Sequence, residues 1–146
     1  MSDETHPSRE ALVQRFQAAV KGTLPDFLGL VWDTVASGHV AGHFDIAPHH
    51  LAPNGYLHAA SVIALADSAC GFGCVASLPE GVVNFTTIEL KSNFLGTARE
   101  GRVHCEARLV HGGRSTQLWD ATVMAGDRTL ALFRCTQMLL APKPAR

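Results

Sequence analysis

Charged side chains are scarce in this sequence. Lysine, arginine, aspartate and glutamate together make up 17% of its 146 residues, and the formal net charge is −1. Binding to the phosphates of a nucleic acid requires a basic surface, which this balance does not supply. The composition therefore argues against nucleic acid as a partner. The length predicts one domain, residues 1–146, with its own hydrophobic core.

The cysteines do not form a metal or redox motif. They stand at positions 70, 74, 105 and 135, each inside an apolar stretch, and Cys70-x-x-x-Cys74 has neither CxxC nor zinc-site spacing. We interpret them as reduced thiols in a core, with no catalytic role for Cys70. Residues 1–21 are polar and lack the apolar run of a signal peptide, so a cytoplasmic chain is expected.

One long apolar segment approaches the length of a membrane span. Residues 59–79 contain a single charge, Asp67, together with three serines and two glycines, and have no basic flank. An aspartate in the middle of a bilayer is costly, whereas a helix that is apolar nearly all round suits the centre of a soluble fold. We therefore expect a buried helix over residues 58–77 and no membrane association.

The rest of the pattern predicts an α+β chain. Apolar positions at helical spacing after Ser8 predict an N-terminal helix over residues 8–21. Glycine-containing turns divide the remainder into strand-like segments. The expected strands are 28–36, 39–46, 82–95, 102–111, 115–124 and 129–140. A sheet of about six antiparallel strands has one face to bury, so it is expected to wrap around the long helix and to be covered elsewhere in a dimer or tetramer.

Asp67 is the residue on which the functional interpretation depends. An ionised carboxylate in so apolar a run must be paired, neutralised or used. One reading is structural, in which the side chain caps a neighbouring backbone or pairs with a lysine across an interface. The other reading is catalytic. Burial would raise the pKa of Asp67, and a nearby helix N-terminus or hydrogen-bond donor would lower it.

The turn before the long helix offers a complementary group. Asn54-Gly55 leads into a helix start at His58-Ala59, where the first backbone N–H groups lack intrahelical partners and carry the positive end of the dipole. Such groups suit the oxyanion formed when a thioester carbonyl is attacked. Asp67 lies about 12 Å further along the same helix, too far for both to act on one carbonyl. If both are catalytic, Ala59 of one subunit must act with Asp67 of another.

Several short motifs occur in an order that resembles a known family. They are Asn54-Gly55-x-x-His58-Ala59-Ala60, then Leu65-Ala66-Asp67-Ser68-Ala69, then Glu89–Leu95 before Gly101, and finally Gly112-Gly113-Arg114-Ser115-Thr116. Over roughly residues 28–140 the chain resembles hotdog-fold acyl-CoA thioesterases of the phenylacetate-degradation and 4-hydroxybenzoyl-CoA type. The resemblance implies a hotdog fold, homodimers or homotetramers with sites between subunits, and hydrolysis of a CoA thioester. It implies no cofactor beyond the coenzyme A of the substrate.

The resemblance also implies roles for individual residues. Asp67 would act as nucleophile or general base, the backbone N–H of Ala59 as oxyanion donor, and the hydroxyl of Thr87 would orient the attacking water. The other implied site residues flank the helix start, line the acyl pocket or contact the nucleotide of coenzyme A: Asn54, Gly55, His58, Phe72, Arg114, Ser115 and Thr116. An arginine with neighbouring hydroxyls suits phosphate. The expected acyl group is aryl or arylacetyl, with a medium-chain group as the next choice.

The sequence departs from the family pattern at two places. The usual His-Gly-Gly is His58-Ala59-Ala60 here, which keeps the N–H groups while the extra methyl narrows the pocket. The polar residue that many members carry three positions before the loop glycine is Ala52, and Asn54 is the nearby candidate to replace it.

Other functional readings stay open at this point. Five of the eight histidines fall between His39 and His58, but their spacing matches no metal signature, so no metal site is expected. His58 and Asp67 could instead transfer protons at carbon, as in a hotdog enoyl-CoA or hydroxyacyl-CoA dehydratase or hydratase. A non-catalytic acyl-CoA-binding module is the third reading. A hydrolase releases the free thiol of coenzyme A, whereas a dehydratase, a hydratase or a binding module does not.

Overall fold

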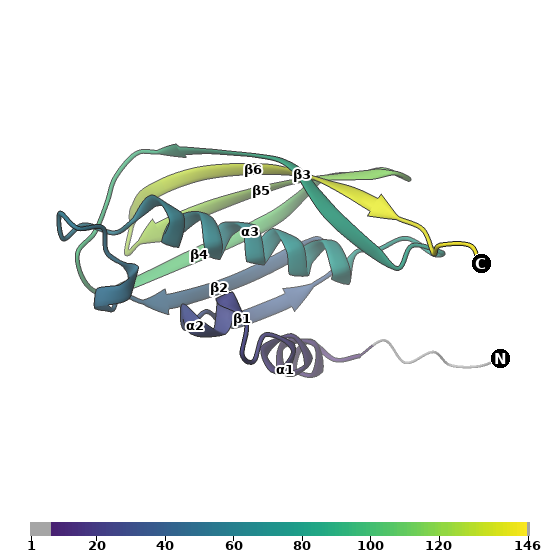
Figure 1. The fold of residues 1–146 in the computed structure, drawn as a ribbon, viewed down its shortest axis with the longest axis horizontal. Coiled ribbons are helices and arrows are strands. Elements are labelled where there is room, and N and C mark those ends of the chain that lie inside the picture. Colours follow the sequence, from purple (N-terminus) through teal and green to yellow (C-terminus); the bar gives the residue numbers. More distant parts are fainter. Residues whose placement is uncertain (1–6, 146) are drawn as a thin grey trace.

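A six-stranded antiparallel sheet curves around one long central helix (Figure 1). The computed structural model describes residues 7–145, and residues 1–6 and 146 lie outside the described part. The helices are α1 (Arg9–Ala19), α2 (Leu24–Phe27) and α3 (Ala59–Ala76), with a 3₁₀ turn, η1 (Pro48–His50). The strands are β1 (Val31–Ala36), β2 (His39–Asp45), β3 (Asn84–Phe94), β4 (Arg102–Gly112), β5 (Thr116–Ala125) and β6 (Arg128–Leu140).

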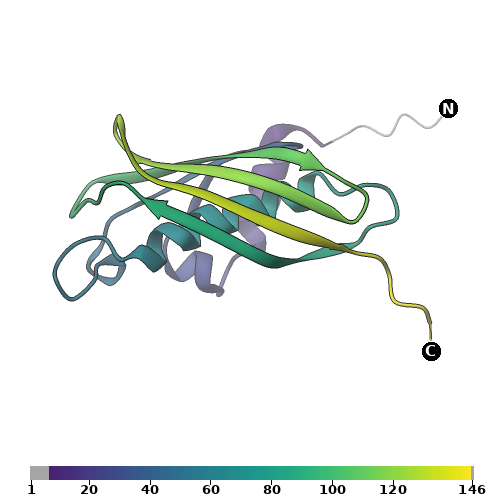
Figure 2. The same ribbon diagram turned by 90° about the horizontal axis from the view of Figure 1, so that it is seen from above.

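The strand order β1-β2-β4-β5-β6-β3 leaves β1 and β3 at the two edges. All neighbouring strands are antiparallel. Figure 2 looks onto the outer face of the sheet, with α3 behind the strands. The sheet therefore covers one side of α3 and leaves its other side for the N-terminal segment or for another molecule.

Helix α3 forms the centre of the core. It contacts all six strands, and Leu65, Ala66, Ala69 and Cys70 are fully buried. By length and composition α3 could cross a membrane, but its contacts with the sheet account for its apolar sequence. The expected buried helix is confirmed, and its two flanking residues, at positions 58 and 77, are its N-cap and C-cap.

The four cysteines are buried free thiols. The neighbouring Cys135 thiol and burial raise the pKa of Cys70 far above its usual range. Burial likewise raises the pKa of Cys74 to about 12. Because only the thiolate is a good nucleophile, Cys70 and Cys74 are inert core side chains at neutral pH.

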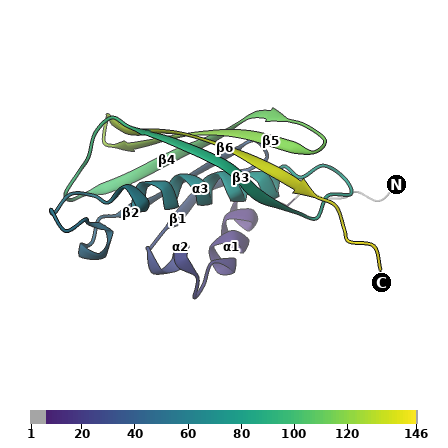
Figure 3. The same cartoon turned by 45° about the horizontal axis from the view of Figure 1, so that its top comes forward.

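The N-terminal segment packs on part of the open side of α3 (Figure 3). Helix α1 is capped by Ser8, whose Oγ accepts the Ala11 N–H at 3.2 Å. It contacts β1, and its Phe16 ring meets the Phe72 ring of α3 with centroids 4.7 Å apart. The predicted N-terminal helix is therefore present and joined to the core through an aromatic contact.

The start of the first strand differs from the sequence expectation. The pattern predicts a strand over 28–36, but β1 begins at Val31, because residues 24–27 form the short helix α2 and Leu28 is its C-cap. Pro25 occupies the first turn of α2, and Gly29 follows it with a left-handed φ of 67°. Helix α2 contacts α3, and this places Pro25 close to the candidate site.

Candidate active site

Asp67 lies midway along α3, on the face that the sheet leaves partly open. Its Oδ1 is buried and has no hydrogen-bond partner among residues 7–145. Burial raises the pKa of this carboxyl above its usual value. A cap or ion pair formed within residues 7–145 therefore does not explain Asp67, and an unpartnered buried carboxylate is a candidate functional group.

A groove of about 220 Å³ opens beside Asp67, between α3, α2 and β3. Its walls are apolar apart from this carboxylate and two hydroxyls. The lining residues are Pro25, Asp67, Ser68, Gly71, Phe72, Val75, Phe85 and Thr87. The structure thus brings together three of the residues predicted from the sequence, namely Asp67, Phe72 and Thr87.

Thr87 is oriented by a glutamine that sequence reasoning missed. The Thr87 hydroxyl donates to Gln137 Oε1 at 2.7 Å. Gln137 is fully buried on β6 and lies opposite Thr87 in the β3–β6 pair. Because the hydroxyl proton goes to Gln137, the Thr87 oxygen can only accept from other groups. Thr87 and Asp67 line the same groove, which therefore offers two hydrogen-bond acceptors to a bound water molecule.

The start of α3 presents an open backbone donor. His58 Nδ1 accepts the Ala60 N–H at 2.9 Å, so Nε2 is the donor of the neutral ring. As the first helical residue, Ala59 has no intrahelical acceptor, and within residues 7–145 none of the hydrogen bonds uses its N–H. The first turn of α3, fully inside the described range, holds no acidic residue that would offset the dipole. The Ala59 N–H therefore has the properties of an oxyanion donor.

The turn before α3 is held by contacts of its own. Gly55 has a φ of 82°, and the Tyr56 N–H donates to Asn54 Oδ1 at 3.1 Å. The Asn54 oxygen thus shapes the turn, and Asn54 does not line the groove at Asp67. The Arg99 guanidinium lies 4.4 Å from the centre of the Tyr56 ring. No local sequence pattern marked Arg99, because its partner is far away in the chain.

His50 anchors the same loop from inside. Its Nδ1 accepts the Ala47 N–H at 2.8 Å, and its Nε2 donates to Leu28 O at 2.7 Å. Its carbonyl oxygen accepts the His58 N–H and the Ser61 hydroxyl, both at 2.9 Å. Burial lowers the pKa of His50, so its neutral ring is a structural clamp with both nitrogens in use. Among residues 7–145, no group of three or more potential metal-ligating side chains is placed to hold an ion.

Within one chain the helix start and Asp67 face different hollows. His58 lines a hollow of about 270 Å³ together with Ala60 and Ala64 of α3. This hollow shares no lining residue with the groove at Asp67. Ala59 and Asp67 are about 12 Å apart along the helix axis. A single chain therefore does not unite the two groups, as the spacing in the sequence predicts.

The predicted coenzyme A contacts lie at the opposite end of α3 from His58. Arg114 and Ser115 are exposed in the β4–β5 turn, directly before Thr116 begins β5. The turn is close to the C-terminal end of α3, because the Gln117 side chain next to it donates to Ser77 O at 2.9 Å. The predicted site residues are thus distributed over the start, the middle and the end of α3.

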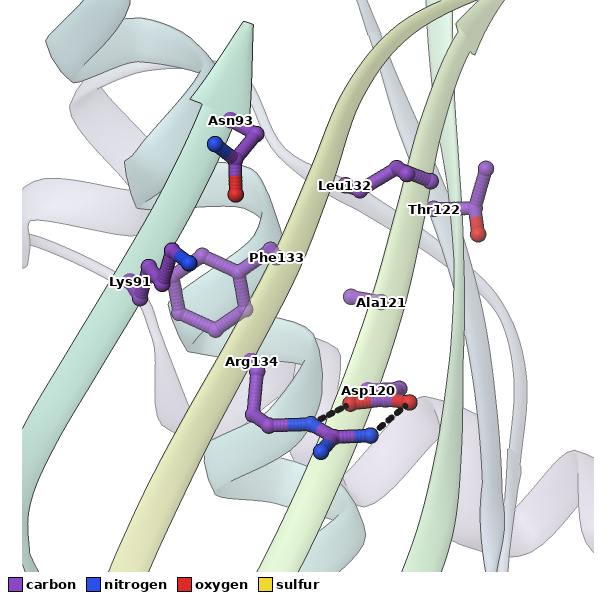
Figure 4. A pocket seen from close by; sticks show the side chains of 8 residues that line it. All are labelled: Lys91, Asn93, Asp120, Ala121, Thr122, Leu132, Phe133 and Arg134. Atoms are coloured by element: carbon purple, nitrogen blue, oxygen red, sulfur yellow. Dashed lines mark hydrogen bonds and ion pairs between the residues drawn. The ribbon is translucent and has the colours of Figure 1, made fainter.

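A hollow on the outer face of the sheet does not contribute to this site (Figure 4). It has a volume of about 320 Å³ and lies over β3, β5 and β6. Arg134 donates to the Asp120 carboxylate through two hydrogen bonds of 2.5 and 2.7 Å, and Lys91 lies beside them (Figure 4). The Asp120 carboxylate in this hollow is already paired with Arg134, and the sheet separates the hollow from Asp67.

Fold and site together define a class of protein. A hotdog sheet wrapped around a central helix presents an unpartnered carboxylate in an apolar groove and an open N–H at a helix start. A general base and an oxyanion donor are the two groups that the attack of water on an acyl carbonyl requires. The chain belongs to the thioesterase superfamily, whose family model matches residues 54–132. It is therefore a thioester hydrolase.

Individual relatives agree with this assignment. A 1,4-dihydroxy-2-naphthoyl-CoA hydrolase of Listeria monocytogenes is 27% identical over 114 residues, which cover 77% of this chain and 92% of the relative. A solved thioesterase family protein from Silicibacter pomeroyi is 29% identical with a TM-score of 0.80, covering 90% of this chain and 99% of that one. A mutant thioesterase from Pseudomonas aeruginosa has a TM-score of 0.85 at 23% identity, covering 95% and 98%, and supports the fold alone. The predicted hotdog fold is confirmed, while the phenylacetate-degradation type stays a prediction.

Proposed function

We propose that this protein hydrolyses aromatic acyl-CoA thioesters, with Asp67 as general base, in sites shared between two subunits. The observation that carries the proposal is the Asp67 carboxylate, which lies in an apolar groove with Oδ1 unpartnered. Its raised pKa makes it a stronger base than a carboxylate in water. A cytoplasmic location stays a prediction.

The edge strand β3 supports a dimer. It is 11 residues long, and within the described chain it pairs with β6 alone. Its side chains Ile88, Leu90 and Phe94 are 52%, 41% and 45% exposed. A long apolar edge of this kind associates with other strands unless it is covered. A two-fold axis beside β3 would pair it with the same strand of a second copy and bring the open faces of the two α3 helices together.

The spacing along α3 indicates where the two helices cross. For Ala59 of each subunit to meet Asp67 of the other, the two-fold axis must pass near the midpoint, at Ile63. Ile63 and Ala64 lie on the half-exposed face of α3, and the small side chain of Ala64 permits close approach. The hollow beside His58 would then receive Asp67 of the partner subunit.

This arrangement supports a complete hydrolytic reaction. Water held between Thr87 Oγ1 and Asp67 loses a proton to Asp67 as its oxygen attacks the thioester carbonyl. Ala59 of the partner subunit donates its N–H to the carbonyl oxygen as that oxygen gains negative charge. The C–S bond then breaks, and the proton on Asp67 passes to the leaving CoA thiolate. The Nε2–H of His58, beside that same helix start, is a candidate donor to the thioester.

Two exposed arginines are candidates for binding the phosphates of coenzyme A. Arg99 lies beside the start of α3, and Arg114 with its neighbouring hydroxyls lies beside the end. An antiparallel pair of helices brings the end of one near the start of the other. Arg99 of one subunit and Arg114 of the other would therefore act at the same end of the dimer, where guanidinium groups suit phosphate oxygens.

An aromatic acyl group fits the groove through its aromatic walls. Phe72 and Phe85 line it, and the Phe72 ring is fixed between Phe16 and Trp32 with centroid distances of 4.7 and 4.9 Å. Fixed rings favour offset stacking or edge contacts with a flat aromatic ligand. The naphthoyl-CoA named for the Listeria relative is an aromatic thioester of this kind. A medium-chain acyl group is the second candidate, because the aliphatic side chains of Pro25 and Val75 also line the groove.

Asp67→Asn tests the proposal, with thiol release from benzoyl-, phenylacetyl-, naphthoyl- and hexanoyl-CoA as the measurement. We expect kcat to fall by about 10²–10⁴-fold, the usual contribution of a positioned general base. Asp120→Asn is the matched control, because it removes a carboxylate on the outer face of the sheet. Undiminished turnover by a folded Asp67→Asn variant would contradict the proposal. Turnover of acyl-CoA without free thiol would indicate a dehydratase or hydratase, and binding without turnover a binding module.

A further inference from the structure

The groove at Asp67 has a direction. Its α3 wall is formed by Asp67, Gly71 and Val75, which stand on successive turns of one helix face. Its length from Asp67 to Val75 is therefore about 12 Å, and it runs away from the helix start at Ala59. If a thioester carbonyl lies at Asp67, its acyl group must extend along these turns.

Gly71 stands in the interior of α3, where glycine costs roughly 0.5–1 kcal/mol relative to alanine. A Cβ at this position would lie 3.2 Å from Phe85 Cζ and 3.8 Å from Phe85 Cε2. Phe85 forms the opposite wall of the groove. The missing side chain therefore keeps the groove open one turn, or about 6 Å, beyond Asp67, where an acyl group that extends from the carbonyl would pass.

Val75 stands where the groove ends. It also lines a second hollow, of about 510 Å³, between α1 and the end of α3. Leu12 and Phe16 of α1 line that second hollow but not the groove. The Val75 side chain is thus common to both, and removing two of its carbons would connect the two spaces.

We infer that Gly71 and Val75 select the acyl group. Gly71 limits the width of the acyl group near the carbonyl, and Val75 limits the length of the acyl group. The inference rests on the proposed function, because it takes the carbonyl to lie at Asp67. The groove then accepts one flat ring or a medium-length chain and rejects chains that pass Val75. Neither residue acts on the reacting atoms.

Two substitutions test the inference through ratios between substrates. Gly71→Ala should lower kcat/KM for phenylacetyl-CoA relative to acetyl-CoA by about tenfold or more, since a methyl-sized change in an apolar pocket has effects of this order. Val75→Ala should raise kcat/KM for dodecanoyl-CoA relative to hexanoyl-CoA by about tenfold. The same ratios can be measured as dissociation constants by calorimetry on the Asp67→Asn background, so that the readout does not require turnover.

Matched controls on the same helix separate selection from general damage. Gly73→Ala adds the same methyl, but 2.4 Å from Trp119 Cη2 in the core. Val62→Ala removes the same carbons from a buried position outside both hollows. Both controls should lower the melting temperature and leave the substrate ratios unchanged.

The outcomes distinguish the inference from the proposed function. If the wild type hydrolyses CoA esters but the Gly71→Ala and Val75→Ala ratios stay at the wild-type value, the inference is wrong and the function stands. If the wild type hydrolyses none of them, the proposed function is wrong, and the binding ratios decide the inference. Changed ratios in either readout, absent from the controls, support it.

Discussion

Ala59→Pro removes one hydrogen-bond donor and leaves the fold in place. Ala59 is the first residue of α3, and proline is favoured at this position because its missing N–H has no intrahelical partner. The residue before a proline must be extended, and His58 already is, with φ −70° and ψ 136°. Ala59 is also exposed in the single chain. The substitution therefore removes the proposed oxyanion donor without a lost helix bond or a clash with the backbone before it.

The expected loss of activity is large and the expected loss of stability small. Removing one oxyanion donor typically lowers kcat by about 10²–10³-fold, or roughly 3–4 kcal/mol. Stability should change by less than about 0.5 kcal/mol, as for other exposed positions. Thiol release, thermal unfolding and light scattering measure these quantities. Ala59→Gly keeps the N–H and serves as the matched variant, with kcat of the same order as the wild type. An Ala59→Pro dimer with full kcat would refute the assignment of the donor.

Mixed dimers extend this test to the two-subunit site. Ala59→Pro and Asp67→Asn chains, each inactive alone, are denatured together in equal amounts and refolded. Half of the dimers should then contain one chain of each kind, with one intact site, giving about a quarter of wild-type activity. A site contained within one chain predicts no recovery above the parent variants.

The remaining predictions concern ionisation. Because burial raises the pKa of Asp67, the folded chain loses stability as pH rises from 3.8 through the folded pKa. In samples diluted until the chain is monomeric, Asp67→Asn should thus unfold at a higher temperature at pH 7, with a free energy of unfolding greater by about 1 kcal/mol, and show no gain near pH 3 in thermal scans. The pH profile of kcat/KM should show an acid limb above pH 3.8 that belongs to Asp67. For His50, burial lowers the pKa, so stability should fall as pH drops below 6.5, and His50→Gln should flatten that slope in urea titrations.

The sequence allowed the central elements to be predicted because their signals are local. Asn54-Gly55 and Leu78-Pro79 bracket the apolar run, and the run became α3 with ends within one residue of the expectation. Helix α2 was missed for the opposite reason. Residues 27–32 form a short apolar stretch that is typical of a strand, and only Gly29, with its left-handed φ, interrupts it.

The candidate site could be predicted only where one residue carried the signal. Asp67 was evident as a lone charge in an apolar helix. Gln137, which orients Thr87, is 50 positions away from it in the chain and meets it through the β3–β6 register. Arg99 reaches Tyr56 in the same long-range way. Such contacts depend on strand order, which periodicity does not determine.

Asp67 also explains why the site should require two subunits. In one chain its Oδ1 is buried without a partner, which costs free energy that nothing in residues 7–145 offsets. In the proposed dimer the helix start of the second copy supplies a positive dipole end in the hollow that faces this carboxylate. The buried Asp67 carboxylate that destabilises the single chain therefore stabilises the dimer. Dimer formation should accordingly weaken as pH falls through the pKa of Asp67, because a neutral carboxyl gains little from a helix dipole. Analytical ultracentrifugation across that pH range measures the dimer dissociation constant, with Asp67→Asn as the pH-insensitive reference.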